Sequence, residues 1–205
     1  EYSSTLEEAR ADLFGLYYLA DPKLVELGIL PDMEAYKAQY YSYLMNGLLT
    51  QMIRIEEGQQ FEEAHMRNRA LISNWVLEHY PSAVQIVCKK GKHFVNISNY
   101  SLLRNAFGEL LAEVQRIKSE GDFEAARQLV ENYAVKVDPE LHQEVLTRYA
   151  KLNLAPYKGF VNPVYTADTD AAGNIVDVKV SYNEGYAEQM LRYSKDYANL
   201  PYRNE

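Results

Sequence analysis

Apolar residues recur at helical spacing along the first three quarters of the chain. Side chains three and four residues apart predict a helix from about Glu7 to Leu19, which ends before Asp21-Pro22 because proline disfavours helix in the residue before it. The same spacing predicts further helices over residues 32–55, 60–79, 100–118, 123–133 and 140–152. Most of the chain is therefore expected to be helical.

Two other stretches have the alternating, β-branched character of strands. Residues 83–88 and 93–97 flank a lysine-rich tip and predict one β-hairpin, and residues 160–166 and 175–181 predict a second. A last amphipathic helix is expected over residues 185–197. The expected fold is mainly α with one or two small β-hairpins. Residues 1–154 would form its helical part, with the hairpin near 83–97, and residues 155–205 a loop, a hairpin and the final helix.

Charge and composition exclude several classes of protein. The 205 residues carry a formal net charge of -8 and no long basic run, which argues against a nucleic acid partner. No apolar stretch reaches the roughly 18 residues that a membrane span needs. The single cysteine, Cys88, rules out intrachain disulfides and favours a reducing compartment, the cytoplasm, although a periplasmic or exported parent stays open.

Two acids in the first predicted helix could carry metal chemistry. Glu8 and Asp12 are four residues apart, so they share one face of an otherwise apolar helix. A glutamate can be a zinc ligand, and an aspartate one turn later can accept a hydrogen bond from a ligand histidine and fix its ring. The alternative is a capping box, because Ser4 precedes Glu7 and Thr5 precedes Glu8 by three residues. Spacing alone leaves both interpretations open.

The run Glu7-Glu8-Ala9-Arg10-Ala11-Asp12 resembles the second signature of the dipeptidyl peptidase III family, and residues 14–18 continue it as in the bacterial branch. The resemblance implies a zinc-dependent exopeptidase that releases dipeptides from the N-termini of short peptides. In this family the position of Glu8 is the third zinc ligand. The positions of Glu7 and Asp12 orient the two ligand histidines. The predicted helices would then belong to the catalytic lobe.

The family's two zinc-binding histidines have no counterpart here. They belong to a His-Glu-x-x-Gly-His helix upstream of the acidic signature, and none of this chain's four histidines is followed by glutamate. With no initiator methionine at the start, we expect a C-terminal fragment that is inactive alone and whose partner is the missing N-terminal part of the same enzyme. The rival interpretation is a noncatalytic helical interaction module in which the three acids only cap a helix.

A second match lies in residues 63–70, where His65 and Arg69 are four residues apart and share a helix face. The resemblance implies that His65 bonds to the substrate carbonyl or its oxyanion, and that Arg69 binds substrate. The residues alone predict a helix-surface histidine, and we expect the same of His79, His93 and His142.

A third match, residues 155–163, resembles the segment whose basic pair reaches the bound peptide. Lys158 keeps one base for substrate binding and Tyr157 replaces the other, while the residues alone predict a solvated loop lysine. The resemblance covers residues 6–163 and is weak from Val164 onward.

Two further patterns are attractive but weak. Residues 168–179 imitate the start of a calcium loop, yet Lys179 stands where a bidentate glutamate is needed, so we predict a hairpin turn. Tyrosines gather at residues 36–43, and without basic neighbours they predict partly buried packing with hydrated hydroxyls rather than a stacking platform.

Overall fold

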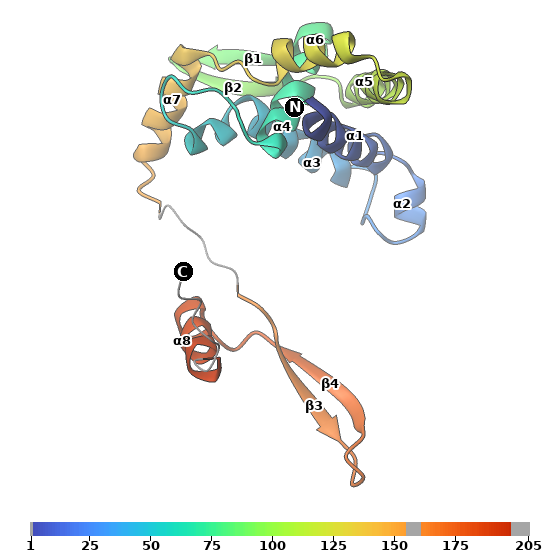
Figure 1. The fold of residues 1–205 in the computed structure, drawn as a ribbon, viewed down its shortest axis with the longest axis vertical. Helices are drawn as coiled ribbons and strands as arrows, with labels where there is room; N and C mark the ends of the chain where they lie inside the picture. The colour runs from blue at the N-terminus through green and yellow to red at the C-terminus, as the bar shows by residue number, and fades with distance from the viewer. Residues whose placement is uncertain (1, 155–160, 198–205) are drawn as a thin grey trace. The chain divides into compact units, whose positions relative to one another are not determined.

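The computed structural model describes residues 2–154 and 161–197. The chain divides into two units, Glu1–Asn153 and Leu154–Glu205. Helices dominate and the two small sheets are both antiparallel hairpins, so the prediction of a mainly α fold is confirmed (Figure 1). Among the described residues, none of the helices is both long enough and apolar enough to cross a membrane.

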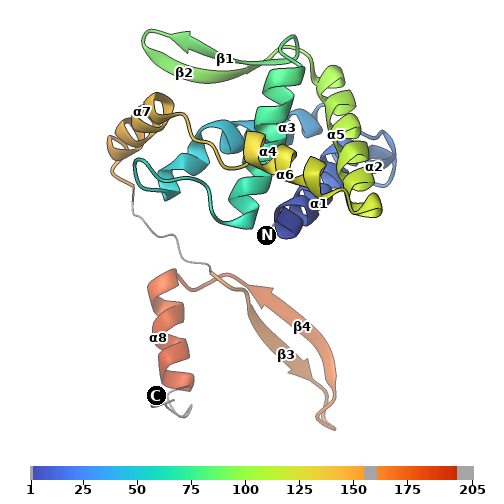
Figure 2. The ribbon, with the colours of Figure 1, turned by 45° about the horizontal axis from the view of Figure 1, so that its top comes forward.

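The first unit is a helical assembly around one central helix. In chain order its elements are α1 (Tyr2–Leu19), α2 (Lys23–Glu26), α3 (Ala35–Leu48), a 3-10 helix (Thr50–Arg54), α4 (Ala64–His79), β1 (Val84–Lys89), β2 (Lys92–Ile97), α5 (Tyr100–Glu120), α6 (Phe123–Tyr133) and α7 (Pro139–Ala150). Helix α4 contacts α1, α3, α5 and α6, and Figure 2 shows it in their midst. Its Leu71, Ile72 and Val76 are fully buried. The core therefore forms around α4.

Local signals fix most of the helix ends in this unit. The side chain of Asn99 caps α5, that of Asp122 caps α6 and that of Asp138 caps α7, each by accepting a backbone N–H of the first turn. Helix α5 ends at Gly121, whose φ of 67° is the left-handed conformation that favours glycine. Because such caps depend on neighbours in sequence, the predicted bounds of these three helices lie within two residues of the observed ones.

The prediction of one continuous helix over residues 32–55 is wrong. Helix α3 ends at Leu48, and Leu49 (φ -131°, ψ -67°) leads into the 3-10 helix. The buried side chain of Gln51 donates from Nε2 to the carbonyl of Gly47 at 3.1 Å and to that of Met66 at 3.2 Å. The first of these carbonyls would otherwise accept the backbone N–H of Gln51, so a side chain replaces a helical hydrogen bond at the break.

Gly47 sets how closely α3 approaches α4. A Cβ at this position would lie 2.0 Å from Ser73 Oγ and 2.5 Å from the carbonyl oxygen of Arg69. Any other residue would therefore push the two helices apart. This close approach carries Tyr43, one turn earlier on α3, towards the face of α4 that bears Asn68 and Arg69.

The first hairpin has a two-residue turn. Val84 pairs with Ile97 and Lys89 with Lys92, which leaves Lys90 and Gly91 at the tip. Both have positive φ, 54° and 69°, the pattern of the tight turn whose twist matches the strands. The hairpin is tied to α7, because Glu144 accepts the His93 N–H at 2.8 Å and contacts His93 Nδ1 at 2.6 Å.

The second unit holds β3 (Val164–Thr169), β4 (Ile175–Ser181) and α8 (Tyr186–Asp196). Asp170 accepts the backbone N–H groups of Ala172 and Asn174, so the residues that imitate a calcium loop form the predicted hairpin turn. The first strand lies three to four residues later than the predicted 160–166.

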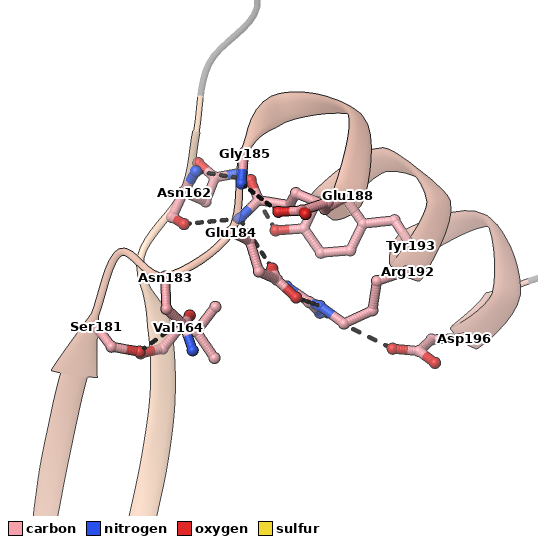
Figure 3. Close-up of polar contacts among 11 residues, drawn as sticks. Asn162, Val164, Ser181, Asn183, Glu184, Gly185, Glu188, Arg192, Tyr193 and Asp196 are labelled. Atoms are coloured by element: carbon pink, nitrogen blue, oxygen red, sulfur yellow. Dashed lines mark hydrogen bonds and ion pairs between the residues drawn. The ribbon is translucent and has the colours of Figure 1, made fainter.

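Polar contacts hold α8 against the residues that precede β3 (Figure 3). The buried amide of Gln189 accepts the N–H of Asn162 at 2.7 Å and donates to its carbonyl at 2.8 Å. Glu184 forms an ion pair with Arg192 at 2.7 Å (Figure 3). The described part of the second unit, residues 161–197, is thus organised by hydrogen bonds and charge rather than by a hydrophobic core.

Candidate active site

Helix α1 presents its acids beside a buried apolar face. Leu6, Ala9, Leu13 and Leu16 are buried in the core, whereas Glu8 and Asp12 lie half-buried at the edge of that face. The helix begins at Tyr2 and has no acid in its first turn, and the buried Thr5 Oγ1 has no hydrogen-bond partner in the described structure. The capping interpretation of these acids is therefore wrong, because they lie inside the helix.

The first turn of α4 fixes His65. The carboxylate of Glu63 caps the helix by accepting the backbone N–H of His65 at 2.9 Å and that of Met66 at 3.1 Å. His65 Nδ1 then lies 3.2 Å from Glu8 Oε2. The two side chains are 57% and 37% exposed, so both keep access to solvent. Two residues separated by 57 positions in the sequence meet at one point on the surface.

Asp12 lies one turn further along α1 and is held by two donors. Tyr43 donates its hydroxyl to Asp12 Oδ2 at 2.8 Å, and Asn68 donates Nδ2 to the same oxygen at 3.1 Å. Burial and the neighbouring Asp12 carboxylate raise the pKa of Tyr43 well above its ordinary value, so the hydroxyl keeps its proton and remains a donor. Within residues 2–154 and 161–197, Asp12 Oδ1 receives no hydrogen bond.

Glu7 points to a different neighbour. Its carboxylate forms ion pairs with Lys118 of α5 at 2.6 Å and with Arg10. Lys118, and to a lesser extent Arg10, lower the pKa of Glu7. The structure therefore brings Glu8, Asp12 and His65 towards one another and places Glu7 in a separate ionic contact.

The other predicted substrate-binding residues are Arg69 and Lys158. Arg69 lies one turn after His65, is half-buried, and lines a groove together with Asp12 and Tyr43. Lys158 lies outside the described residues. The described part of the chain has no group of three or more histidine, cysteine, aspartate or glutamate side chains that could hold a metal ion. Glu8 is chemically suited to be one ligand, but it cannot form a site alone.

Sequence reasoning missed Tyr43 and Asn68. Asn68 lies three residues after His65 on α4, so helical spacing could have identified it. Tyr43 belongs to the tyrosines that were predicted to pack with hydrated hydroxyls. The hydroxyls of Tyr43 and Tyr40 instead bind protein groups, Asp12 Oδ2 and the carbonyl of Leu16.

One of the other histidines, His142, differs from its predicted surface position. His142 is only 1% exposed, and its Nε2 lies 3.0 Å from the carbonyl oxygen of Met52. His93 is on strand β2 and pairs with Glu144. The error has one cause: a lone histidine carries no sequence signal for which backbone group or carboxylate folds against it.

Comparison with known proteins adds an independent line of evidence. "Dipeptidyl peptidase 3" from Rattus norvegicus is 28% identical over 147 residues, which are 66% of this chain and 20% of that protein. The protein of the same name from Homo sapiens is 29% identical over the same shares. The chain thus spans about a fifth of the length of these relatives.

A solved structure, that of DPP III from Caldithrix abyssi, matches with a TM-score of 0.54 and 28% identity over 72% of this chain and 25% of that one. The model of Peptidase family M49 matches residues 1–189, so it extends past the point where the motifs in the sequence become weak. The chain therefore belongs to peptidase family M49, a family of metallopeptidases.

Proposed function

We propose that this chain supplies part of the active site of a zinc-dependent dipeptidyl peptidase, which releases dipeptides from the N-termini of short peptides. The observation that carries the proposal is the contact between His65 Nδ1 and Glu8 Oε2 at 3.2 Å. It joins the candidate metal ligand and the candidate oxyanion donor on neighbouring helices. Support comes from family membership and from the relatives named dipeptidyl peptidase 3.

Glu8 is the residue proposed to bind the metal. Its carboxylate contacts only His65 among the described residues, so no lysine or arginine competes with a cation for it. Zinc, when bound, would polarise the scissile carbonyl and activate a water molecule. Two histidine ligands and a general base would have to come from elsewhere in the full-length protein, so we propose that the 205-residue chain alone is inactive.

The remaining residues are proposed to orient the ligand histidines and to bind the substrate. Asp12, fixed through Oδ2 by Tyr43 and Asn68, offers Oδ1 to a ligand histidine. Glu7 would orient the other ligand histidine, but its carboxylate also forms ion pairs with Lys118 and Arg10. His65 would donate a hydrogen bond from its ring to the developing oxyanion, and Arg69 and Lys158 would bind the peptide.

Replacing Glu8 in the full-length protein tests the metal role. Glu8→Gln should remove most of the bound zinc and of the hydrolysis of dipeptidyl arylamides, because a neutral amide is a poor zinc ligand. Zinc content by atomic absorption and turnover are measured together, with the exposed loop variant Glu56→Gln as the matched control. Full zinc occupancy with normal turnover in Glu8→Gln would refute the role.

The oxyanion role of His65 predicts a different signature. His65→Ala should lower turnover by about 100- to 1000-fold while zinc content stays the same, because a contact made in the transition state is not a metal ligand. Near-normal turnover with a much higher KM would instead make His65 a ground-state binding group. No change in either constant would return it to the helix-surface histidines.

A further inference from the structure

A groove with a cavity volume of about 840 Å³ lies between α1 and α3 in the first unit. It begins one turn along α1 from Glu8, because Asp12 is part of its wall. Tyr43 and Asn46 of α3 line it, and two arginines, Arg54 of the 3-10 helix and Arg69 of α4, complete it. The groove is therefore adjacent to the contact between Glu8 and His65.

Arg54 and Arg69 differ from the other arginines that the structure describes. Arg10, Arg104, Arg116, Arg127, Arg148 and Arg192 each form an ion pair with a carboxylate. Arg67 donates Nε to the carbonyl of Phe61. Over residues 2–154 and 161–197, Arg54 and Arg69 have neither an ion pair nor a hydrogen bond.

This lack of partners leaves both guanidinium groups to solvent within the described residues, since Arg54 is exposed and Arg69 is half-buried. Asp12 shares the groove, yet among the described residues its carboxylate accepts from Tyr43 and Asn68 and pairs with neither arginine. A guanidinium has five donors in a fixed fork that matches a carboxylate. Two of them in one groove are typical of a site for an anion that comes from outside.

The groove also has a candidate acceptor among its lining residues. Asn46 donates Nδ2 to Thr50 Oγ1 at 3.2 Å, while its Oδ1 is buried and has no hydrogen-bond partner in the described structure. A buried acceptor without a donor is unfavourable, and a ligand N–H that reached Asn46 Oδ1 would satisfy it. A ligand that carries both a carboxylate and an amide N–H satisfies the groove, and a peptide has both.

We propose that Arg54 and Arg69 form a subsite for a carboxylate of the bound peptide, either its C-terminus or an acidic side chain. The inference rests on the proposed function and extends it to a substrate class. Residues four apart on a helix lie about 6 Å from each other, and a peptide residue spans about 3.5 Å. The carboxylate would therefore lie one or two residues beyond the carbonyl held at His65.

The test uses the full-length enzyme and three tetrapeptides with free N-termini. These are tetraalanine with a free carboxylate, tetraalanine amide, and the amide with glutamate in the third position. Arg54→Gln should lower kcat/KM at least about tenfold, mainly through KM, for peptides that carry the recognised carboxylate, because charge-assisted hydrogen bonds are lost. Tetraalanine amide should be unaffected. Arg127→Gln on α6, a half-buried arginine paired within its own helix, is the matched control and should change none of the three.

The losses of kcat/KM on the three peptides show whether the subsite exists and which carboxylate it binds. A loss confined to the free C-terminus, or to the glutamate peptide, supports the subsite and identifies the source of its carboxylate. No loss, or an equal loss on all three peptides, overturns it. If wild-type enzyme hydrolyses none of them, the proposed function fails, and calorimetric binding of the same peptides tests the subsite separately. The subsite then requires that wild type prefer a carboxylate peptide to the amide and that Arg54→Gln lose this preference.

Discussion

The two units of the chain differ in where their apolar side chains lie. In the part of the chain that the structure describes, every buried apolar residue falls between Leu6 and Val145, in the first unit. In the second unit the buried side chain is that of Gln189, while Tyr165, Val178 and Val180 are exposed. Apolar residues are present in both units, but among the described residues only those of the first unit are covered by enough packed elements to be buried.

The second hairpin makes the difference clear. Tyr165 pairs with Val180 and Ala167 with Val178, so these four residues share one face. The opposite face carries Thr166 and Lys179 together with the acidic pair of Asp168 and Asp177. A two-stranded hairpin is at best marginally stable in water without a packed face. An amphipathic pattern therefore does not by itself produce a core, because burial also needs a third element to pack against.

The largest expected effect tests the core of the first unit. Phe107→Ala should destabilise this unit by about 3 to 5 kcal/mol, because a fully buried ring packed 4.9 Å from that of Tyr40 is replaced by a cavity. Trp75, the single tryptophan, lies in this unit and reports its unfolding by fluorescence in urea. Phe123→Ala is the control, since that ring is 68% exposed. Equal losses for the two variants would contradict the conclusion that burial of Phe107 in the core, and not the loss of a ring as such, stabilises the first unit.

A smaller effect concerns the contact between the first hairpin and α7. Burial alone would raise the pKa of Glu144, but hydrogen bonds from the His93 side chain and backbone and from Arg148 outweigh it and lower the pKa to about 2. The ordinary value is 4.5, so the stabilisation is present above pH 4.5 and is lost as the pH falls towards 2.

Glu144→Gln should therefore cost about 1.5 to 3 kcal/mol at neutral pH. Part of the wild type's loss of stability between pH 5 and pH 3 should also disappear in the variant. Urea unfolding followed by Trp75 fluorescence at both pH values measures this difference. The same pH dependence in wild type and Glu144→Gln would show that other carboxylates account for it.

The smallest effects belong to the second unit. Gln189→Ala should cost about 1 to 3 kcal/mol locally, because it leaves the backbone N–H and carbonyl of Asn162 without partners. Faster amide exchange should be confined to residues near α8, with the fluorescence of Trp75 unchanged. Val180→Thr, at a position 56% exposed, should change stability by less than about 0.5 kcal/mol. A large loss there would mean that the apolar face of the hairpin is covered after all.

Much of the fold was predictable because the deciding interactions are local. Helix caps and tight turns join residues within four positions of one another. Examples are the caps by Asp122 and Asp138, the turn at Lys90 and Gly91, and the turn closed by Asp170. The break at Leu49 was not predictable. It depends on Gln51, whose side chain also reaches the carbonyl of Met66, and the helical periodicity of the segment continues through it.

The sequence by itself determined that Glu8 and Asp12 share one face of a helix, since 3.6 residues per turn fixes that relation without any partner. It also determined the resemblance that family membership then confirmed. Only the tertiary structure decided that His65 contacts Glu8 and that Tyr43 and Asn68 bind Asp12. It also decided that His142 is buried and that Arg54 and Arg69 line one groove. These contacts join residues on different elements, and they exist only because packing around α4 brings those elements together.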